Sequence, residues 1–196
     1  MAIVKHIKSK NANYTDAINY LFYQHDEKTK TLLLNEYGQP MLREEFYADG
    51  LNCTPETFDL DCSGTNRTFN KNRRPGEIKS HHYIISFDPK DAVECGLTGQ
   101  RAQELSMELN RKIFPGYQAL VVTHTDGGNH SGNIHTHIVI NSVRKYDAPR
   151  EDYMTQLGDN KAGRKHRSTN KFLEYFKKEV MEMCEREGLH QINLLS

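Results

Sequence analysis

The chain has 196 residues, of which 36% are hydrophobic and 27% are charged, a composition that fits one globular domain with a substantial core. Its 26 basic and 26 acidic side chains give a formal net charge of zero, so the overall charge offers no support for nucleic-acid binding, and any such surface must be local. No stretch approaches the ~20 apolar residues of a membrane span, and the N-terminus has no apolar signal-peptide core. We therefore expect a cytoplasmic protein that makes no membrane contact.

The four cysteines, Cys53, Cys62, Cys95 and Cys184, include no CxxC pair. This spacing favours reduced, incidental thiols over disulfides, and it argues against a zinc ion held by cysteine. We expect residues 1–196 to form a single domain. Because the sequence ends directly after a helical pattern, we expect this domain to be the N-terminal part of a longer protein.

The N-terminal part of the chain predicts a strand at residues 2–9 and a helix at residues 15–25. Spacing of 100° per residue gives this helix one apolar stripe, with Tyr20 nearly opposite to it. The stripe consists of Tyr14, Ile18, Leu21 and Phe22. Residues 29–34 then predict a short strand and residues 37–50 a loop or hairpin.

The remaining pattern alternates helices and strands. It predicts helices at residues 55–69 and 97–114, strands at 81–88, 117–124 and 134–142, and a last helix that begins after Ser168 or Thr169 and ends near Gly188. The neighbouring strands at 118–124 and 134–142 can pair antiparallel. We therefore predict an α+β fold, an antiparallel central sheet with helices mainly on one face. The opposite face would carry His82, Ser86, His135 and His137.

The stretch 124–141 contains four histidines and three glycines. Because alternate side chains of a strand point to opposite faces, His135 and His137 share one face. Two imidazoles on a strand and a third from a neighbouring segment commonly form a metal site with open positions. The sequence predicts such a site with His124 as the third ligand, and His130 is an open alternative. The competing interpretation is a histidine-rich surface hairpin that binds no metal.

Three motifs follow one another along the chain: DAINY, which ends at Tyr20, ISF, which contains Ser86, and His-x-Asp followed by HxHxxxN at residues 135–141. In this order they resemble the relaxases of plasmid and transposon conjugation, of the MOB-P type, within the HUH single-strand endonucleases. The resemblance covers about residues 2–190. It implies the HUH-endonuclease fold and a metal-dependent DNA-nicking activity.

The resemblance also implies roles for individual residues. Tyr20 matches the catalytic nucleophile, and His135 and His137 match the paired metal ligands, with His124 as the third. Asp126 matches the acidic position of His-x-Asp, and we predict it as a second catalytic residue. Its chemistry allows it to orient a ligand histidine, and the alternative is a simple turn residue.

A tyrosine nucleophile gives a 5′-phosphotyrosyl link and a free 3′ hydroxyl, and the reverse reaction can rejoin the strand. Because the tyrosine side chain ordinarily has a pKa near ~10, it needs a base, which the sequence does not identify. The resemblance implies Mg²⁺ or Mn²⁺ as the metal. Imidazole ligands also favour Zn²⁺, Ni²⁺ or Co²⁺.

The resemblance implies single-stranded DNA at an origin of transfer as the partner, with a hairpin in that DNA and with an accessory relaxosome protein and a coupling protein. Ser86 matches a serine that contacts DNA near the nick, and Asn141 matches the asparagine that closes the histidine motif. We predict both as DNA-binding residues. Local basic residues predict the backbone contacts, although such a run is also typical of a solvated surface. These residues are Arg73, Arg74, Arg144, Lys145, Lys161, Arg164, Lys165 and Arg167.

Three other interpretations compete with this one. A rolling-circle replication initiator or a transposase of the HUH class usually carries its tyrosine after the histidine motif, where Tyr175 is the available candidate. A non-catalytic DNA-binding module with a structural metal, or a metallohydrolase that uses water, would use the same histidines. Formation of a covalent protein–DNA adduct separates the relaxase from the last two.

Overall fold

The centre of the protein is a five-stranded antiparallel sheet with the strand order β1-β3-β5-β4-β2. The computed structural model describes residues 3–26, 28–126, 133–190 and 193–195. In chain order the elements are β1 (Ile3–Ser9), α1 (Thr15–Phe22), β2 (Phe46–Leu51), α2 (Phe58–Thr68), β3 (Ser80–Ser86), α3 (Pro89–Glu94), α4 (Gly99–Ile113), β4 (Ala119–His124), β5 (His135–Asn141) and α5 (Asn170–Arg186).

The three central strands are those with the strongest apolar pattern. β4 and β5 pair antiparallel, with Val121 opposite Ile138, which confirms the pairing predicted from their sequences. β2 was not predicted as a strand, because its sequence FYADGL contains Asp49 and Gly50 and follows a turn signal. It forms through its pairing with the buried strand β4. The predicted strand at 29–34 is wrong, since those residues make only isolated bridges.

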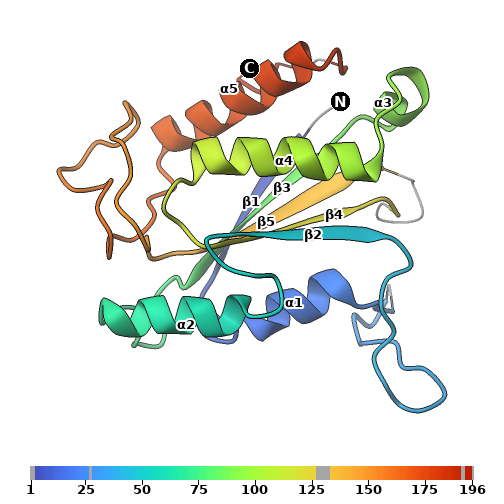
Figure 1. Cartoon of the computed structure of the whole chain (residues 1–196), viewed down its shortest axis with the longest axis horizontal. Coiled ribbons are helices and arrows are strands. Elements are labelled where there is room, and N and C mark those ends of the chain that lie inside the picture. The colour runs from blue at the N-terminus through green and yellow to red at the C-terminus, as the bar shows by residue number, and fades with distance from the viewer. Residues whose placement is uncertain (1–2, 27, 127–132, 191–192, 196) are drawn as a thin grey trace.

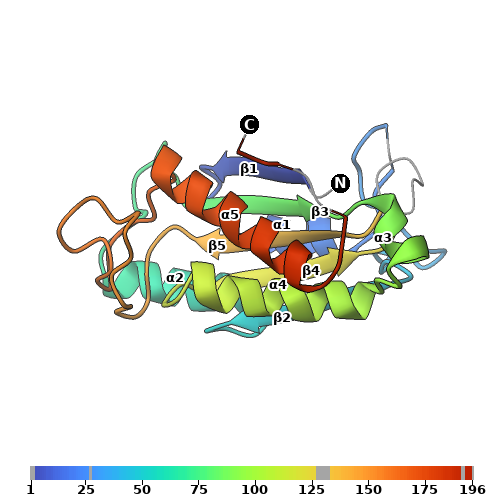
Figure 2. The same cartoon turned by 90° about the horizontal axis from the view of Figure 1, so that it is seen from above.

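Two long helices, α4 and α5, cover one face of the sheet (Figure 1). Both are amphipathic, and the stripes predicted from their sequences are buried, including Leu105 of α4 and Phe176 of α5. Thr98 and Thr169 cap these helices by accepting hydrogen bonds from backbone N–H groups of their first turns. Viewed from above, α4 runs roughly along the strands, whereas α5 crosses them obliquely (Figure 2).

The other face of the sheet is covered in part by the shorter helices α1 and α2 (Figure 1). Leu21 of α1 and Phe58 of α2 are fully buried there against Leu120 and Val122. The α+β antiparallel architecture is therefore confirmed, but the expectation of helices mainly on one face holds only for the two long helices. α1 is also shorter than predicted, because Tyr23 leaves the helix in an extended conformation and pairs with Leu42.

Within the part of the chain that the structure describes, no helix combines the length and the apolar character needed to cross a membrane.

A candidate metal centre beside an exposed tyrosine

Strand alternation and register bring three histidines together on the α1 side of the sheet. His135 and His137 are two residues apart in β5, so they point to the same face. His124, the last residue of β4, lies directly opposite His135. Ser86, the last residue of β3, lies opposite His135 on the other side. The register therefore assembles residues from three strands at one end of the sheet.

The ligand atoms of His124, His135 and His137 all lie within 4.8 Å of one another. Their ring centroids are 4.9–5.2 Å apart. His124 and His137 are almost fully buried, whereas His135 is partly exposed. This spacing and burial are those of a three-imidazole site with one side open to solvent. His130, the alternative third ligand, lies outside the described residues.

Each of the three rings has one nitrogen held by a neighbouring group. His124 Nε2 lies 2.7 Å from the carbonyl oxygen of Leu21, and His135 Nδ1 lies 3.1 Å from that of Asn133. His137 Nδ1 lies 2.8 Å from Nε2 of His82. Within the described residues, the remaining nitrogens, Nδ1 of His124 and Nε2 of the other two, have no hydrogen-bond partner. Such second contacts fix the tautomer and orientation of a metal-ligating histidine, so the donor set fits a divalent cation.

The surroundings of His124 and His137 favour their neutral forms. Burial, with a further contribution from the charge of Arg43, lowers the pKa of His124 to about 4. Burial and then the neighbouring His82 lower the pKa of His137 well below its ordinary value. A metal binds the neutral form of imidazole, so these shifts favour coordination over protonation at physiological pH.

Tyr20 lies next to this cluster on α1. Its side chain is exposed, whereas the adjacent Leu21 is fully buried. The Tyr20 ring centroid lies 6.2 Å from that of His137, in an edge-on arrangement. The bond from His124 to the Leu21 carbonyl fixes α1 against the histidines. An exposed tyrosine thus lies beside the three histidines.

Two histidines that the sequence did not assign belong to the same surroundings. His82 was placed on the correct face by strand alternation, but its bond to His137 depends on the register between β3 and β5. His25 follows α1, and its ring centroid lies 5.7 Å from that of Tyr20. Only the turn of the chain after Phe22 brings His25 to this position.

Asp126 does not contact a ligand histidine. Its Oδ2 lies 2.6 Å from Nη1 of Arg43, in an ion pair that ties the end of β4 to the segment before β2. Its charge acts on His124 only at a distance, where it slightly opposes the lowering of the pKa. The orienting role considered from the sequence is thus filled by backbone carbonyls and His82.

Two of the predicted DNA contacts are buried. Asn141 is fully buried, and its side chain accepts from the hydroxyl of Tyr14 and from the backbone N–H of Val143. Arg144 is 2% exposed and lies over the ring of Tyr117 at 4.3 Å. Neither side chain is presented to solvent in this structure, so their burial does not support the direct DNA contact that the sequence predicts for both. Asn141 ends the buried strand β5 and Arg144 follows it, so the packing around this strand decides their burial, which the local charge does not reveal.

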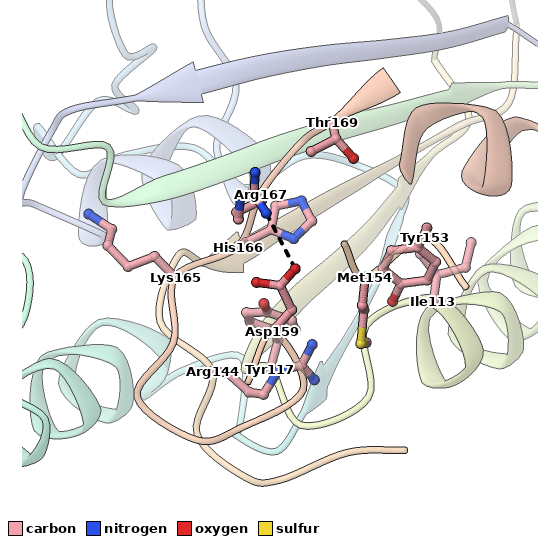
Figure 3. A pocket seen from close by; sticks show the side chains of 10 residues that line it. All are labelled: Ile113, Tyr117, Arg144, Tyr153, Met154, Asp159, Lys165, His166, Arg167 and Thr169. Carbon is pink, nitrogen blue, oxygen red and sulfur yellow. Dashed lines mark hydrogen bonds and ion pairs between the residues drawn. The ribbon is translucent and has the colours of Figure 1, made fainter. Parts of the chain in front are cut away.

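The other predicted basic residues lie on two separate surfaces. Figure 3 shows Lys165 and Arg167 with Arg144 around a cavity of about 20 Å³, where Arg167 is 3.4 Å from Asp159. This cavity has room for about one water molecule and lies beyond the end of β4 opposite to His124. Lys161 and Arg164 are exposed nearby, and Lys145 is partly buried.

Arg73 belongs to a different surface, a larger polar groove beside α2. This groove has a volume of about 500 Å³, and Arg74 is exposed next to it. Its basic lining residues are Arg67, Lys71, Arg73 and Lys79. Tyr14, at the start of α1, also lines it, so the groove lies at the opposite end of α1 from Tyr20.

Tyr175, the downstream alternative to Tyr20, lies on α5. Its ring packs against that of Tyr153, at 4.8 Å between centroids, on the face of the sheet opposite to the histidine cluster. This position argues against Tyr175 as the nucleophile for that cluster.

Residues 33–189 match the family model "Relaxase: MobA/VirD2-like, nuclease domain". Two proteins named "Protein rlx" from Staphylococcus aureus are 29% and 31% identical over 140 residues, which are 71% of this chain and 35% and 36% of the relatives. The chain therefore spans about a third of the length of these relatives. The matched range of the family includes the three histidines and Ser86, but it begins after Tyr20.

A solved structure described as "Molecular Basis of Vancomycin Resistance Transfer in Staphylococcus aureus" superposes with a TM-score of 0.55. The superposition covers 100% of this chain and 99% of that chain, at 12% identity. At this identity the likeness shows the fold alone.

Proposed function

The chain belongs to the relaxase family of MobA/VirD2-like nuclease domains, and we propose that it nicks one DNA strand at an origin of transfer through a covalent tyrosine–DNA intermediate. The observation that carries this proposal is the exposed Tyr20 beside three imidazoles, two of them buried, whose ligand atoms lie within 4.8 Å of one another. The biological process would be the conjugative transfer of a plasmid or integrative element from the cytoplasm.

In the proposed reaction, the hydroxyl oxygen of Tyr20 attacks the scissile phosphorus in line, and the bond from phosphorus to the 3′ oxygen breaks. The products are a phosphodiester between Tyr20 and the 5′ end and a free 3′ hydroxyl, which takes up the proton that tyrosine lost. Because one phosphodiester replaces another, the 3′ hydroxyl can attack in the reverse direction and rejoin the strand. The exposure of Tyr20 leaves space for the DNA backbone in front of it.

His124, His135 and His137 would hold the divalent cation. When bound there, the cation supplies Lewis-acid stabilisation of the charge that develops on the phosphoryl oxygens. Mg²⁺ and Mn²⁺ are the proposed ions for activity, and Zn²⁺, Ni²⁺ or Co²⁺ would bind more tightly to imidazole. His82 would keep the His137 ring oriented through its 2.8 Å bond.

His25 is our candidate for the base that accepts the proton of Tyr20. Its Nδ1 lies 3.0 Å from the carbonyl oxygen of Tyr23, and a carbonyl only accepts, so Nδ1 carries the proton. The second nitrogen, Nε2, is then the proton acceptor of the neutral ring. We expect His25→Gln to slow nicking roughly 100-fold, with metal affinity unchanged. Unchanged nicking would remove His25 from the mechanism.

The groove beside α2 is the proposed track for the DNA backbone. Arg67, Lys71 and Arg73 give it a local positive charge that the zero net charge of the chain hides. Backbone contacts of this kind make binding fall steeply with salt. We expect Arg67→Ala with Lys71→Ala to weaken binding of a single-stranded oligonucleotide and to reduce its salt dependence. Lys178→Ala with Lys112→Ala, on α5 and α4, is the matched control.

The central experiment incubates the protein with a single-stranded origin oligonucleotide and Mn²⁺ or Mg²⁺ and looks for a covalent adduct on a denaturing gel. We expect an adduct with the wild type and none with Tyr20→Phe. Tyr23→Phe and Tyr175→Phe are the matched controls and should keep it. An adduct that survives Tyr20→Phe would move the nucleophile to another tyrosine.

Other outcomes would replace the proposal. Cleavage without any adduct would indicate a water nucleophile. Binding of DNA without cleavage under any metal would indicate a non-catalytic module with a structural metal. An adduct that disappears only with Tyr175→Phe would support an initiator or transposase of the HUH class. Accessory and coupling proteins are proposed partners of the longer protein, and co-purification with oligonucleotide-bound protein would test them.

A further inference from the structure

A second group of metal-binding side chains lies between α3 and the chain that follows α5. Asp91 belongs to α3, Cys95 is its C-terminal capping residue, and His190 comes from the other end of the sequence. Gly188, with φ of +67°, reverses the chain at the end of α5. The backbone N–H of His190 then donates to Asp91 Oδ1 at 2.8 Å, and Figures 1 and 2 show this return of the chain to α3.

The three side chains present one ligand atom each, and these atoms lie within 4.8 Å of one another. Cys95 Sγ is 3.7 Å from His190 Nδ1, and Asp91 Oδ1 is 2.7 Å from the same nitrogen. In a tetrahedral zinc site with Zn–N near ~2.0 Å and Zn–S near ~2.3 Å, ligand atoms lie roughly 3.3–3.7 Å apart. The sulfur is already at that distance. The oxygen would move outward by about half an ångström as the cation replaced the shared proton.

The side chains of Asp91 and His190 are each held in orientation by a further contact. Asp91 is fully buried, and its Oδ2 accepts from the backbone N–H of Asp88 at 3.1 Å, so Oδ1 is turned toward His190. Glu94 Oε2 lies 2.9 Å from His190 Nε2. A carboxylate on the outer nitrogen of a histidine is the arrangement that orients metal-ligating imidazoles. It directs Nδ1 of His190 toward Asp91 and Cys95.

Two other roles for this group are less well supported. Desolvation, and then the charges of Asp91 and Glu94, raise the pKa of the Cys95 thiol, which argues against a reactive thiolate nucleophile. A salt bridge between His190 and the two carboxylates would account for the nitrogen contacts. In that arrangement the Cys95 thiol donates to the carbonyl oxygen of Gly188 at 3.4 Å, although its sulfur also lies at ligand distance from the same nitrogen.

We propose that Asp91, Cys95 and His190 form a second metal site, separate from the nicking centre, that binds Zn²⁺ with its fourth position open to water. The mixed S, N and O donor set favours zinc over Mg²⁺ or Mn²⁺. The bound ion would join the chain after α5 to α3, directly beyond the end of β3. Its role would be to stabilise the fold, because a structural zinc contributes its binding energy to folding.

The test uses metal-stripped full chain in the His135→Ala/His137→Ala background, so that the nicking centre does not compete. Titration with Co²⁺ should give one equivalent of binding and a thiolate-to-cobalt charge-transfer absorption. Titration with Zn²⁺ should displace the cobalt and raise Tm. An all-imidazole site cannot give the charge-transfer absorption, so this readout requires a cysteine ligand, which the variants below assign.

The variant Cys95→Ala should abolish the charge-transfer absorption and weaken Zn²⁺ binding by more than the 10–100-fold that loss of an outer contact causes. Cys95 is exposed, so this replacement leaves the core intact. Cys53→Ala is the matched control and should keep both signals. Unchanged binding in Cys95→Ala, or no charge-transfer absorption in its parent, would overturn the proposal. Neither result depends on DNA nicking, so failure here is distinct from failure of the relaxase proposal.

Discussion

Two histidine clusters lie on opposite faces of the same sheet, and burial lowers the pKa of histidines in both. On the α1 side, His124, His135 and His137 each offer a ligand atom, and these atoms lie within 4.8 Å of one another. On the α5 side, His6 and His81 bond each other at 3.0 Å, and His166 bonds the hydroxyl of Tyr83 at 2.8 Å.

The difference lies in what the ring nitrogens do. The rings of the α5-side cluster are stacked or edge-on with one another and with aromatic residues. These histidines therefore pack against other rings of the protein. In the α1-side cluster, one nitrogen of each ring contacts a backbone carbonyl or His82. The other nitrogen of each ring has no hydrogen-bond partner among the described residues. Burial that lowers histidine pKa values is therefore common to both clusters, and the close approach of three ligand atoms is what distinguishes a candidate metal site.

The largest expected effect is on the α1 side. His137→Ala should reduce nicking roughly 1,000-fold or more, because a bound cation contributes several kcal/mol to phosphoryl transfer. Adduct formation per folded molecule is the measurement, with folding checked by circular dichroism. His81→Phe, on the other face, should leave this rate within about threefold of the wild type. Equal losses in the two variants would remove the distinction between the clusters.

Acid should destabilise the protein through the α5-side cluster. Burial lowers the pKa of His81 to about 3, whereas an unfolded histidine has a pKa of 6.5. Below pH 6.5 the unfolded chain takes up a proton that the folded chain does not, so the stabilisation present above 6.5 falls as the pH falls. We expect His81 to contribute a slope of about 1.4 kcal/mol per pH unit to the free energy of unfolding.

Urea titrations of metal-free protein at several pH values measure this slope. His81→Phe keeps an aromatic ring but cannot titrate, so its stability should depend less steeply on pH between about 6 and about 4. An equal slope in wild type and variant would show that His81 titrates normally in the folded protein.

A smaller effect is expected at the residue that orients His137. His82→Phe keeps the ring volume but loses the 2.8 Å bond, and it should weaken metal binding about 10–100-fold. Raising the metal concentration should restore nicking, which it cannot do for Tyr20→Phe. Isothermal titration with Mn²⁺ gives the affinity directly, and an unchanged affinity would contradict an orienting role.

The smallest effect is expected at Asp126. The Asp126 side chain is half exposed in its ion pair with Arg43. Asp126→Asn should therefore change the free energy of unfolding by less than about 1 kcal/mol. Nicking should fall less than about tenfold, because Asp126 contacts no ligand histidine. A loss as large as that of Tyr20→Phe would instead establish the catalytic role that the motif resemblance implies.

Local sequence patterns determined the strands that carry the site. The alternation in β5 is a property of neighbouring residues, so it placed His135 and His137 on one face, and the helical spacing of α1 set Tyr20 nearly opposite the apolar stripe. Strand termini, caps and apolar stripes are likewise decided within a few residues. For this reason the antiparallel α+β fold, the three-histidine cluster and the exposed tyrosine were all accessible before the structure.

Contacts between distant segments were decided only by the tertiary structure. β2 has a weak strand pattern and forms because β4 offers it a partner. Arg144 carries a charge that predicts exposure, yet it is buried against Tyr117. Cys95 contacts His190, although 95 residues separate the two in the sequence. Register, chain reversal and packing set these contacts, and none of them leaves a periodic signal in the sequence.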